Sequence, residues 1–170
     1  MKAVLISIKP EWCELIAIGR KKLELRKTFP NLPIPFKCYM YQTKRKWIYR
    51  WAEKLGLWKL AEVLPHGQGK VIGEFICFAK MGHCETKCIG TAERASCVRR
   101  ETIHEYANGK EVFGWGICDL KIYDIPKPLS KFRSYNCSVK WENGFPVPTH
   151  EIKRPPQSWC YVEELTDNDH

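Results

Sequence analysis

The sequence predicts an α+β fold in which a mixed β-barrel of about six strands is flanked by two or three helices. Short apolar segments of strand length recur along the 170-residue chain, and a few segments between them have helical spacing. Apolar residues make up 44% of the chain and aromatic residues 12%, which is typical of a globular protein. We expect a single domain over residues 1–163 and a polar tail over 164–170.

The first 27 residues contain a strand, a helix and a second strand. Residues 3–8, AVLISI, predict a buried strand. Pro10 suits the first position of a helix, and Gly19 supplies its end. In residues 21–27 leucines alternate with charged residues, which predicts a strand with one apolar and one charged face. Glu24 lies on the charged face.

The next segments differ in character. Residues 28–36 contain three prolines and predict an extended loop, whereas residues 37–43, KCYMYQT, predict an aromatic strand. Tryptophans and aliphatic residues recur at near-helical spacing among basic residues in the segment that follows. We expect a basic helical insertion near residues 44–64.

The second half of the chain predicts three further strands and one helix. Residues 70–80 are apolar on both faces and predict a central strand. A short helix is expected at 99–109, with Cys97 near its start, and a strand at 114–125. Residues 126–156 hold six prolines and are expected to be irregular. Residues 157–162, QSWCYV, predict the last strand.

The positive charge is concentrated in the first third of the chain. The formal net charge is +9, and residues 1–60 contain 14 Lys and Arg against 4 Asp and Glu, whereas residues 61–170 contain 14 against 15. Clustered cations are typical of proteins that bind polyanions, because neutralised phosphates release counterions. A basic surface without a partner is the alternative. No apolar run is long enough to span a membrane, so no membrane role is expected.

Nine cysteines are scattered along the chain, several of them inside strand-like segments. The N-terminus lacks the pattern of a secretion signal, so we expect reduced thiols and a cytoplasmic location in a bacterial host cell. One group offers soft ligands suited to zinc but lacks the paired C-x-x-C spacing of a zinc site: His83, Cys84, Cys88 and Cys97. We expect neither a metal nor a cofactor.

Glu24 is the only acidic residue between Leu15 and Ala52, a segment with ten Lys and Arg. It belongs to a G-x-K-x-x-E-x-R motif formed by Gly19, Lys21, Glu24 and Arg26. Alternation along a strand places the glutamate and the arginine on one face, about 7 Å apart. Two cations and a carboxylate could bind a polar ligand. An exposed ion pair of little energetic value is the alternative.

The segment ISIKPEWCELIAIGRKKLELRK resembles the opening of the ASCH domain, a branch of the PUA-like superfamily whose signature is this motif. KVIGEF, GWGICDLKIYDIPKPLSKF and PPQSWCYV resemble later parts of the domain, so the resemblance spans most of residues 3–163. The segments SIKPEWCELI and PPQSW are similar in sequence to segments of small stand-alone ASCH proteins of phages and prophages. The resemblance implies a PUA-like barrel with a cleft that binds RNA or a nucleotide-like ligand.

The resemblance and the aromatic content together select candidate site residues. The ligand-binding candidates are Lys9, Trp12, Lys21, Glu24, Arg26, Trp115, Ser158 and Trp159. Cations outside the cleft are expected to contact a nucleic-acid backbone, and these are Lys27, Lys44, Arg45, Lys46 and Arg50. Binding of a host protein through the basic insertion is a third, weaker interpretation. The oligomeric state stays open.

One enzyme branch of the family supplies the alternative function, a small hydrolase that removes the acetyl group from acetylcytidine or acts on RNA. The resemblance matches Lys21 and Glu74 to two groups of that branch, and Glu24 could act as a base for water, so the three are the candidate acid–base groups. That branch uses a threonine nucleophile where this chain has Glu24, and a carboxylate cannot replace a hydroxyl nucleophile in the same mechanism. Glu74 has apolar neighbours on both sides, and the resemblance favours a place for it in the cleft; a buried structural pair with an Arg or Lys is the alternative.

Overall fold

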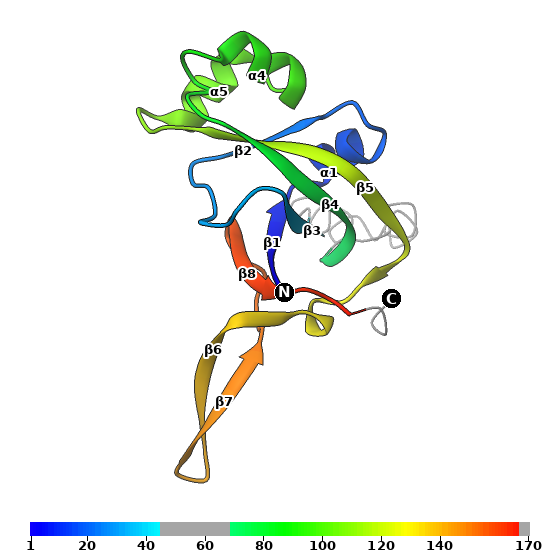
Figure 1. The fold of residues 1–170 in the computed structure, drawn as a ribbon, viewed down its shortest axis with the longest axis vertical. Coiled ribbons are helices and arrows are strands. Elements are labelled where there is room, and N and C mark those ends of the chain that lie inside the picture. Colours follow the sequence, from blue (N-terminus) through cyan, green and yellow to red (C-terminus); the bar gives the residue numbers. More distant parts are fainter. Residues whose placement is uncertain (45–68, 167–170) are drawn as a thin grey trace, which may run out of the picture.

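The computed structural model describes residues 1–44 and 69–166 of the chain (Figure 1). The predicted basic helical insertion near 44–64 lies almost wholly outside the described residues, and so does the end of the predicted tail. Within the described residues, Glu164 is attached to the N-terminus, because its amide donates to the Met1 carbonyl at 2.8 Å. The boundary of the domain at residue 163 stays a prediction.

Eight strands form one mixed sheet among the described residues, in the order β2-β5-β4-β3-β1-β8-β6-β7. Neighbouring strands are antiparallel except β1 and β3, which run parallel. The strands are β1 (Lys2–Ile8), β2 (Leu23–Arg26), β3 (Phe36–Gln42), β4 (Lys70–Met81), β5 (Phe113–Lys127), β6 (Arg133–Glu142), β7 (Phe145–Glu151) and β8 (Trp159–Glu163).

The α+β class is confirmed, but the number of strands and the closure of the barrel are corrected. The prediction was about six strands, and the described sheet has eight. The sheet is not closed, since β2 and β7 form its two edges. The central position of β4 is confirmed, because it lies between β3 and β5. Its apolar residues on both faces suit a strand buried on both sides.

Three α-helices are described: α1 (Pro10–Ala17), α4 (Ile89–Ser96) and α5 (Arg100–Ala107). A short 3₁₀ helix, η1, covers Leu129–Lys131. Pro10 opens α1 as predicted, and Gly19 follows its end with a φ of +72° that suits glycine. The helix predicted at 99–109 is confirmed as α5. Cys97 does not belong to its start, because it terminates the unpredicted α4 with a left-handed φ of 58°.

The predicted irregular segment over 126–156 is corrected by a β-hairpin formed by β6 and β7. Asn143 and Gly144 connect the two strands with φ angles of 52° and 81°, the pattern of a type I′ turn. Pro146 and Pro148 lie in β7. A proline cannot donate a backbone hydrogen bond, but it is tolerated in an edge strand such as this one. The hairpin extends away from the rest of the molecule, opposite α4 and α5 (Figure 1).

The core is divided by the sheet. One cluster packs α1 against β1, β3, β4 and β5 and includes the fully buried Trp115, and another packs β2 against α4 and α5. The cysteines whose side chains are described are free, and burial raises the pKa of Cys84 and of Cys160 to about 11. No helix in the described ranges is both long and apolar enough to cross a membrane.

Candidate ligand-binding pocket

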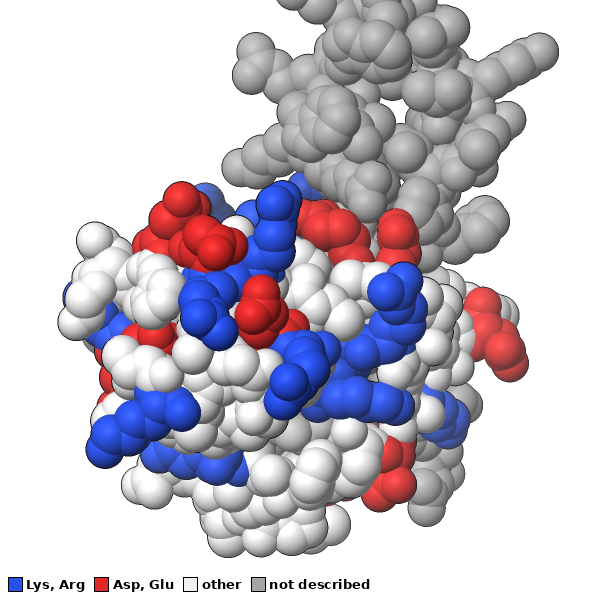
Figure 2. All heavy atoms as spheres, turned by 90° about the horizontal axis from the view of Figure 1, so that it is seen from above, with Lys and Arg blue, Asp and Glu red and all other residues white. Residues whose placement is uncertain are grey.

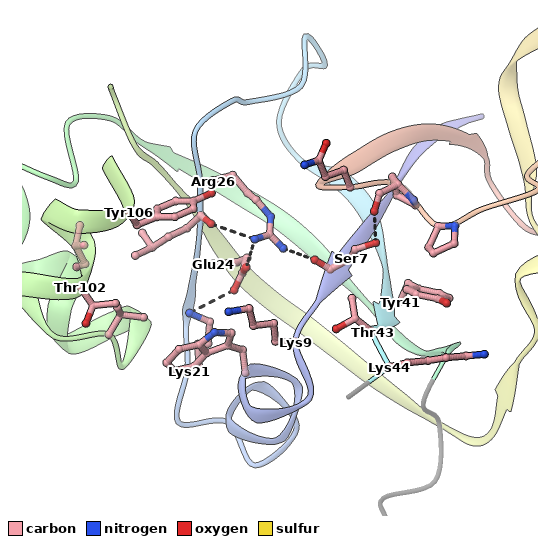
Figure 3. A pocket seen from close by; sticks show the side chains of 17 residues that line it. Ser7, Lys9, Lys21, Glu24, Arg26, Tyr41, Thr43, Lys44, Thr102 and Tyr106 are labelled. Atoms are coloured by element: carbon pink, nitrogen blue, oxygen red, sulfur yellow. Dashed lines mark hydrogen bonds and ion pairs between the residues drawn. The ribbon is translucent and has the colours of Figure 1, made fainter. Parts of the chain in front are cut away.

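A cavity of about 740 Å³ opens beside the predicted motif, a volume typical of small-ligand sites. Its walls come from α1, β2, the ends of β1 and β3, α5 and the loop before β8 (Figure 3). The lining includes Ser7, Lys9, Trp12, Lys21, Glu24, Arg26, Tyr41, Thr43, Lys44, Thr102, Tyr106, Pro155, Pro156 and Gln157.

The turn after α1 positions Lys21. Gly19 allows the chain to reverse, and the Lys21 amide donates to the Leu15 carbonyl at 2.9 Å. The next residue, Lys22, donates its amide to the Ala95 carbonyl of α4 at 2.8 Å, which joins the turn to that helix. The strand β2 then alternates as predicted. Its leucines pack toward α4 and α5, while Glu24 and Arg26 lie together on the other face.

Lys21, Glu24 and Arg26 form a connected buried cluster (Figure 3). Lys21 Nζ lies 3.3 Å from Glu24 Oε2, and Arg26 Nη1 lies 3.0 Å from Glu24 Oε1. The exposed fractions of Lys21 and Glu24 are only 2% and 3%. The expected alternative of an exposed ion pair on a strand is therefore excluded.

Backbone carbonyls fix both cations of this cluster. Lys21 Nζ donates to the Ser96 carbonyl at the end of α4 at 2.8 Å, and Arg26 Nη2 donates to the Ser7 carbonyl of β1 at 2.5 Å. The cluster therefore connects β2 to both α4 and β1. Side chains that are held by several partners are ordered before a ligand arrives, which lowers the entropic cost of binding.

Two buried polar atoms of the cluster have spare hydrogen-bonding capacity. Within the described part of the chain, Glu24 Oε2 accepts no hydrogen bond, although it is ion-paired with Lys21, and Arg26 Nε donates none. An unsatisfied buried polar atom costs about 1–3 kcal/mol. A ligand that offers a donor to Glu24 and an acceptor to Arg26 would recover part of that cost.

Six polar residues that line the pocket were missed by the sequence analysis: Ser7, Tyr41, Thr43, Thr102, Tyr106 and Gln157. Thr102 and Tyr106 are four residues apart in α5 and therefore lie on one face of the helix. Lys27 Nζ lies 5.1 Å from the centre of the Tyr106 ring. Helical spacing could have paired the two α5 residues, but no local pattern places α5 beside β2.

Three of the predicted ligand-binding residues do not line the pocket. Trp115 is fully buried in the core, with its ring centre 5.2 Å from that of Phe29. The Trp159 indole donates to the Thr28 hydroxyl at 2.9 Å, and the Ser158 carbonyl accepts from the Ser7 amide. The structure brings the other candidates to the pocket, namely Lys9, Trp12, Lys21, Glu24 and Arg26.

Glu74 also lies outside the pocket lining, in a partly buried network on another part of the sheet. The Tyr123 hydroxyl donates to Glu74 Oε2 at 2.5 Å, and Lys37 Nζ lies 3.9 Å from Glu74 Oε1. Lys37 also pairs with Glu164 at 2.9 Å. Burial, and secondarily the Glu74 carboxylate, raise the pKa of Tyr123 above its ordinary value. Glu74 therefore does not line this pocket as the favoured interpretation expected, and its pairing with Lys37 corresponds to the alternative, a structural pair.

Replacing Glu74 with glutamine is expected to weaken the fold but not the pocket. The amide keeps the size of the side chain but removes the negative charge that pairs with Lys37 and accepts the hydrogen bond of the Tyr123 hydroxyl. The free energy of unfolding should therefore fall by about 1–3 kcal/mol. Denaturant titration and ligand-binding measurements on the same preparation check both parts. A loss of ligand affinity in a variant of unchanged stability would instead place Glu74 in the function of the pocket.

The predicted backbone-contacting cations are only partly described. Lys27 lies beside Tyr106 next to the pocket, and Lys44 lines the pocket itself. The remaining three, Arg45, Lys46 and Arg50, lie outside the described residues. Figure 2 shows Lys and Arg side chains spread over one face of the molecule, with a few acidic residues between them.

The cysteine and histidine group does not converge into a metal site in the described structure. Cys84 donates to the Met81 carbonyl and Cys97 to the Arg20 carbonyl, so their thiols have separate backbone partners. His83 faces Glu85 and Glu111. No group of three or more potential ligands could hold a metal within residues 1–44 and 69–166.

Comparison with solved structures identifies the fold. The crystal structure of ASCH from Zymomonas mobilis superposes with a TM-score of 0.57 at 16% sequence identity, covering 98% of this chain and 90% of that chain. Two single-residue mutants of that protein superpose with TM-scores of 0.58 and 0.57. The chain has the ASCH fold. Neither a protein-family model nor a curated protein sequence matches it.

The ASCH fold confirms the resemblance that the G-x-K-x-x-E-x-R motif carried. The match extends over nearly the whole chain, so it is not confined to the motif and its two flanking elements. An identity of 16% establishes the ASCH fold but assigns no activity to the pocket.

Proposed function

We propose that the pocket binds a nucleotide, either free or within an RNA chain. The observation that carries the proposal is the buried cluster of Lys21, Glu24 and Arg26 at the wall of a cavity of nucleotide size. Four cations and one carboxylate line the cavity, because Lys9 and Lys44 add to the cluster, so its formal charge is +3. A net positive pocket favours an anionic ligand.

The phosphate and the base of such a ligand would contact different parts of the pocket. Lys9 and Lys44 are exposed and form no ion pair within the described residues, so they are free to bind phosphate oxygens. Glu24 Oε2 and Arg26 Nε are buried and can receive the polar edge of a base. Trp12 and Tyr106 offer aromatic surface beside them.

The hydrolase alternative has less support. Of its three acid–base groups, Lys21 and Glu24 line the pocket, but Glu74 is held by Tyr123 and Lys37 elsewhere. The ammonium of Lys21 is also occupied by the Ser96 carbonyl and Glu24. We therefore expect binding without turnover when the protein is incubated with acylated cytidine or with RNA. Product formation that Lys21→Ala abolishes would establish the enzyme instead.

The decisive measurement is nucleotide affinity as a function of salt. The wild-type protein should bind ribonucleoside monophosphates and short single-stranded RNA more weakly as salt rises, and the double variant Lys9→Ala/Lys44→Ala should lower the logarithmic salt slope by about 0.7 for each lost phosphate contact. Glu24→Gln should weaken binding about tenfold without changing that slope, because it alters recognition of the base and not of the phosphate.

A matched double variant controls for the general loss of charge. Lys87 and Lys110 are exposed and lie outside the pocket lining, so Lys87→Ala/Lys110→Ala should leave affinity nearly unchanged. The proposal fails if the wild-type protein binds neither probe at low salt. It also fails if the control pair weakens binding as much as the Lys9 and Lys44 pair.

A further inference from the structure

The β6–β7 hairpin exposes an unusual amount of apolar surface. It extends from the sheet, and only its base pairs with β8, where Ser134 lies opposite Val162 (Figure 1). Trp141 and Phe145, next to the turn, are each 73% exposed. Tyr135, Val139 and Val147 are exposed as well. Exposed aromatic groups in such a cluster commonly mark a binding surface.

The register of the hairpin gathers apolar residues on one face. Trp141 lies opposite Pro146, and Val139 lies opposite Pro148. Residues directly opposite each other in an antiparallel pair share a face, as do residues two apart in one strand. These four side chains therefore form a continuous apolar face. Phe145 lies opposite Glu142 on the other face, so both sides of the tip carry an aromatic ring.

The residues that flank the hairpin are basic, whereas the hairpin itself has a formal charge of zero. Residues 131–154 contain five Lys and Arg against two Asp and Glu, and the excess comes from Lys131, Lys153 and Arg154, outside β6 and β7. Lys153 and Arg154 are exposed and form no ion pair in the described structure. Both precede Pro155, Pro156 and Gln157, which line the pocket. A basic path therefore leads from the pocket wall to the base of the hairpin.

We propose that the hairpin binds single-stranded nucleic acid as a continuation of the pocket. This inference rests on the proposed function: one nucleotide occupies the pocket, the chain passes Lys153 and Arg154, and later bases stack on Trp141 and Phe145. Basic grooves combined with exposed aromatic rings are how proteins bind single strands without sequence preference.

A second copy of the chain is a poorer occupant of this surface. Pro146 and Pro148 remove two N–H donors from β7, which hinders pairing between edge strands of two copies. The exposed Lys153 and Arg154 at the base of the hairpin instead attract a polyanion.

Comparing RNA ligands of different length distinguishes binding by the hairpin from binding by the pocket. An RNA of about 12 nucleotides, within the ~4–16 nucleotide range of single-strand sites, should bind more tightly than a ribonucleoside monophosphate. Trp141→Ala should weaken binding of this RNA about tenfold, and Trp141→Phe should restore most of it, because either ring can stack on a base. The affinity for the monophosphate should not change in either variant.

The matched control for the lost apolar side chain is Ile125→Ala. Ile125 is 82% exposed and lies in β5, outside the hairpin, so its truncation should leave both affinities unchanged. For the charges, Lys153→Glu/Arg154→Glu should lower the salt slope for the RNA, whereas Lys87→Glu/Lys110→Glu should lower it less. All substituted residues are exposed, so circular dichroism should show an unchanged fold.

The outcomes distinguish this inference from the proposed function. If Trp141→Ala leaves RNA affinity unchanged while Glu24→Gln weakens it, the hairpin proposal is wrong and the pocket proposal stands. If the hairpin variants weaken RNA binding and the pocket variants do not, the pocket proposal is wrong, and so is the claim that the hairpin continues the pocket. Two further outcomes would overturn the hairpin proposal. One is a concentration-dependent dimer that Trp141→Ala abolishes. The other is that polyglutamate of equal length and concentration displaces the bound RNA as readily as unlabelled RNA does.

Discussion

Replacing Lys21 with methionine is expected to lower the free energy of unfolding by about 3–5 kcal/mol, because the change leaves a buried carboxylate with one partner fewer. Methionine keeps most of the volume of the side chain but cannot donate to Glu24 or to the Ser96 carbonyl. Chemical denaturation monitored by tryptophan fluorescence measures the change. Arg26 remains beside Glu24 Oε1, so the protein should still fold.

The double variant Lys21→Met/Glu24→Leu separates the charge from the packing. With the carboxylate also removed, it should recover much of the lost stability, as is found when a whole buried ion pair is replaced by apolar residues. Lys22→Met is the matched control, because Lys22 is adjacent and exposed and should change stability little. Wild-type stability in Lys21→Met would mean that the buried pair is not formed.

Truncating Trp115 to alanine is expected to cost about 3–5 kcal/mol of folding free energy, since it opens a large cavity in the core. Its ring lies in a cluster of aromatic residues, with centres 5.2 Å from Phe29, 5.9 Å from Phe36 and 6.0 Å from Trp159. The fall in the denaturation midpoint, with an unchanged denaturant slope, measures the loss.

Trp115→Phe tests whether the residue also contacts the ligand. Phenylalanine fills most of the site and removes the indole N–H, which has no hydrogen-bond partner in the described structure. The stability cost should therefore be smaller than that of alanine. Nucleotide affinity should match the wild type, because Trp115 does not line the pocket. Weaker binding by a stable Trp115→Phe protein would restore the ligand contact that the sequence predicted.

Local patterns predicted the elements around the motif well. The position of Pro10, the helix stop at Gly19 and the alternation of β2 depend on neighbouring residues alone, and the structure confirms all three. The Asn143–Gly144 turn was equally local, but the surrounding prolines were given more weight than this strong hairpin signal. Helix α4 was missed because Gly90, Thr91 and Ser96 have low intrinsic helix propensity.

The long-range part of the site was not predictable from such patterns. Glu74 lies in an apolar strand, and its partner Tyr123 is 49 positions away, so its neighbours in sequence could not say which side of the sheet it faces. Thr102 and Tyr106 reach the pocket only because α5 packs beside β2. Sequence reasoning thus located the cations and the carboxylate of the cluster, but not the walls that enclose a ligand.

The hydrogen bond from the Lys21 ammonium to the Ser96 carbonyl holds the end of α4, and with it the α5 wall of the pocket, next to the Lys21–Glu24–Arg26 cluster. Ser96 ends α4, and α5 begins four residues later with the face that carries Thr102 and Tyr106. Any change that removes this ammonium therefore releases the wall at the same time as it removes a charge. Ligand affinities of Lys21 variants will therefore combine the loss of a charge with the displacement of the pocket wall. The side chains of Lys9 and Lys44 form no ion pair in the described structure, so variants at these positions measure the effect of charge alone.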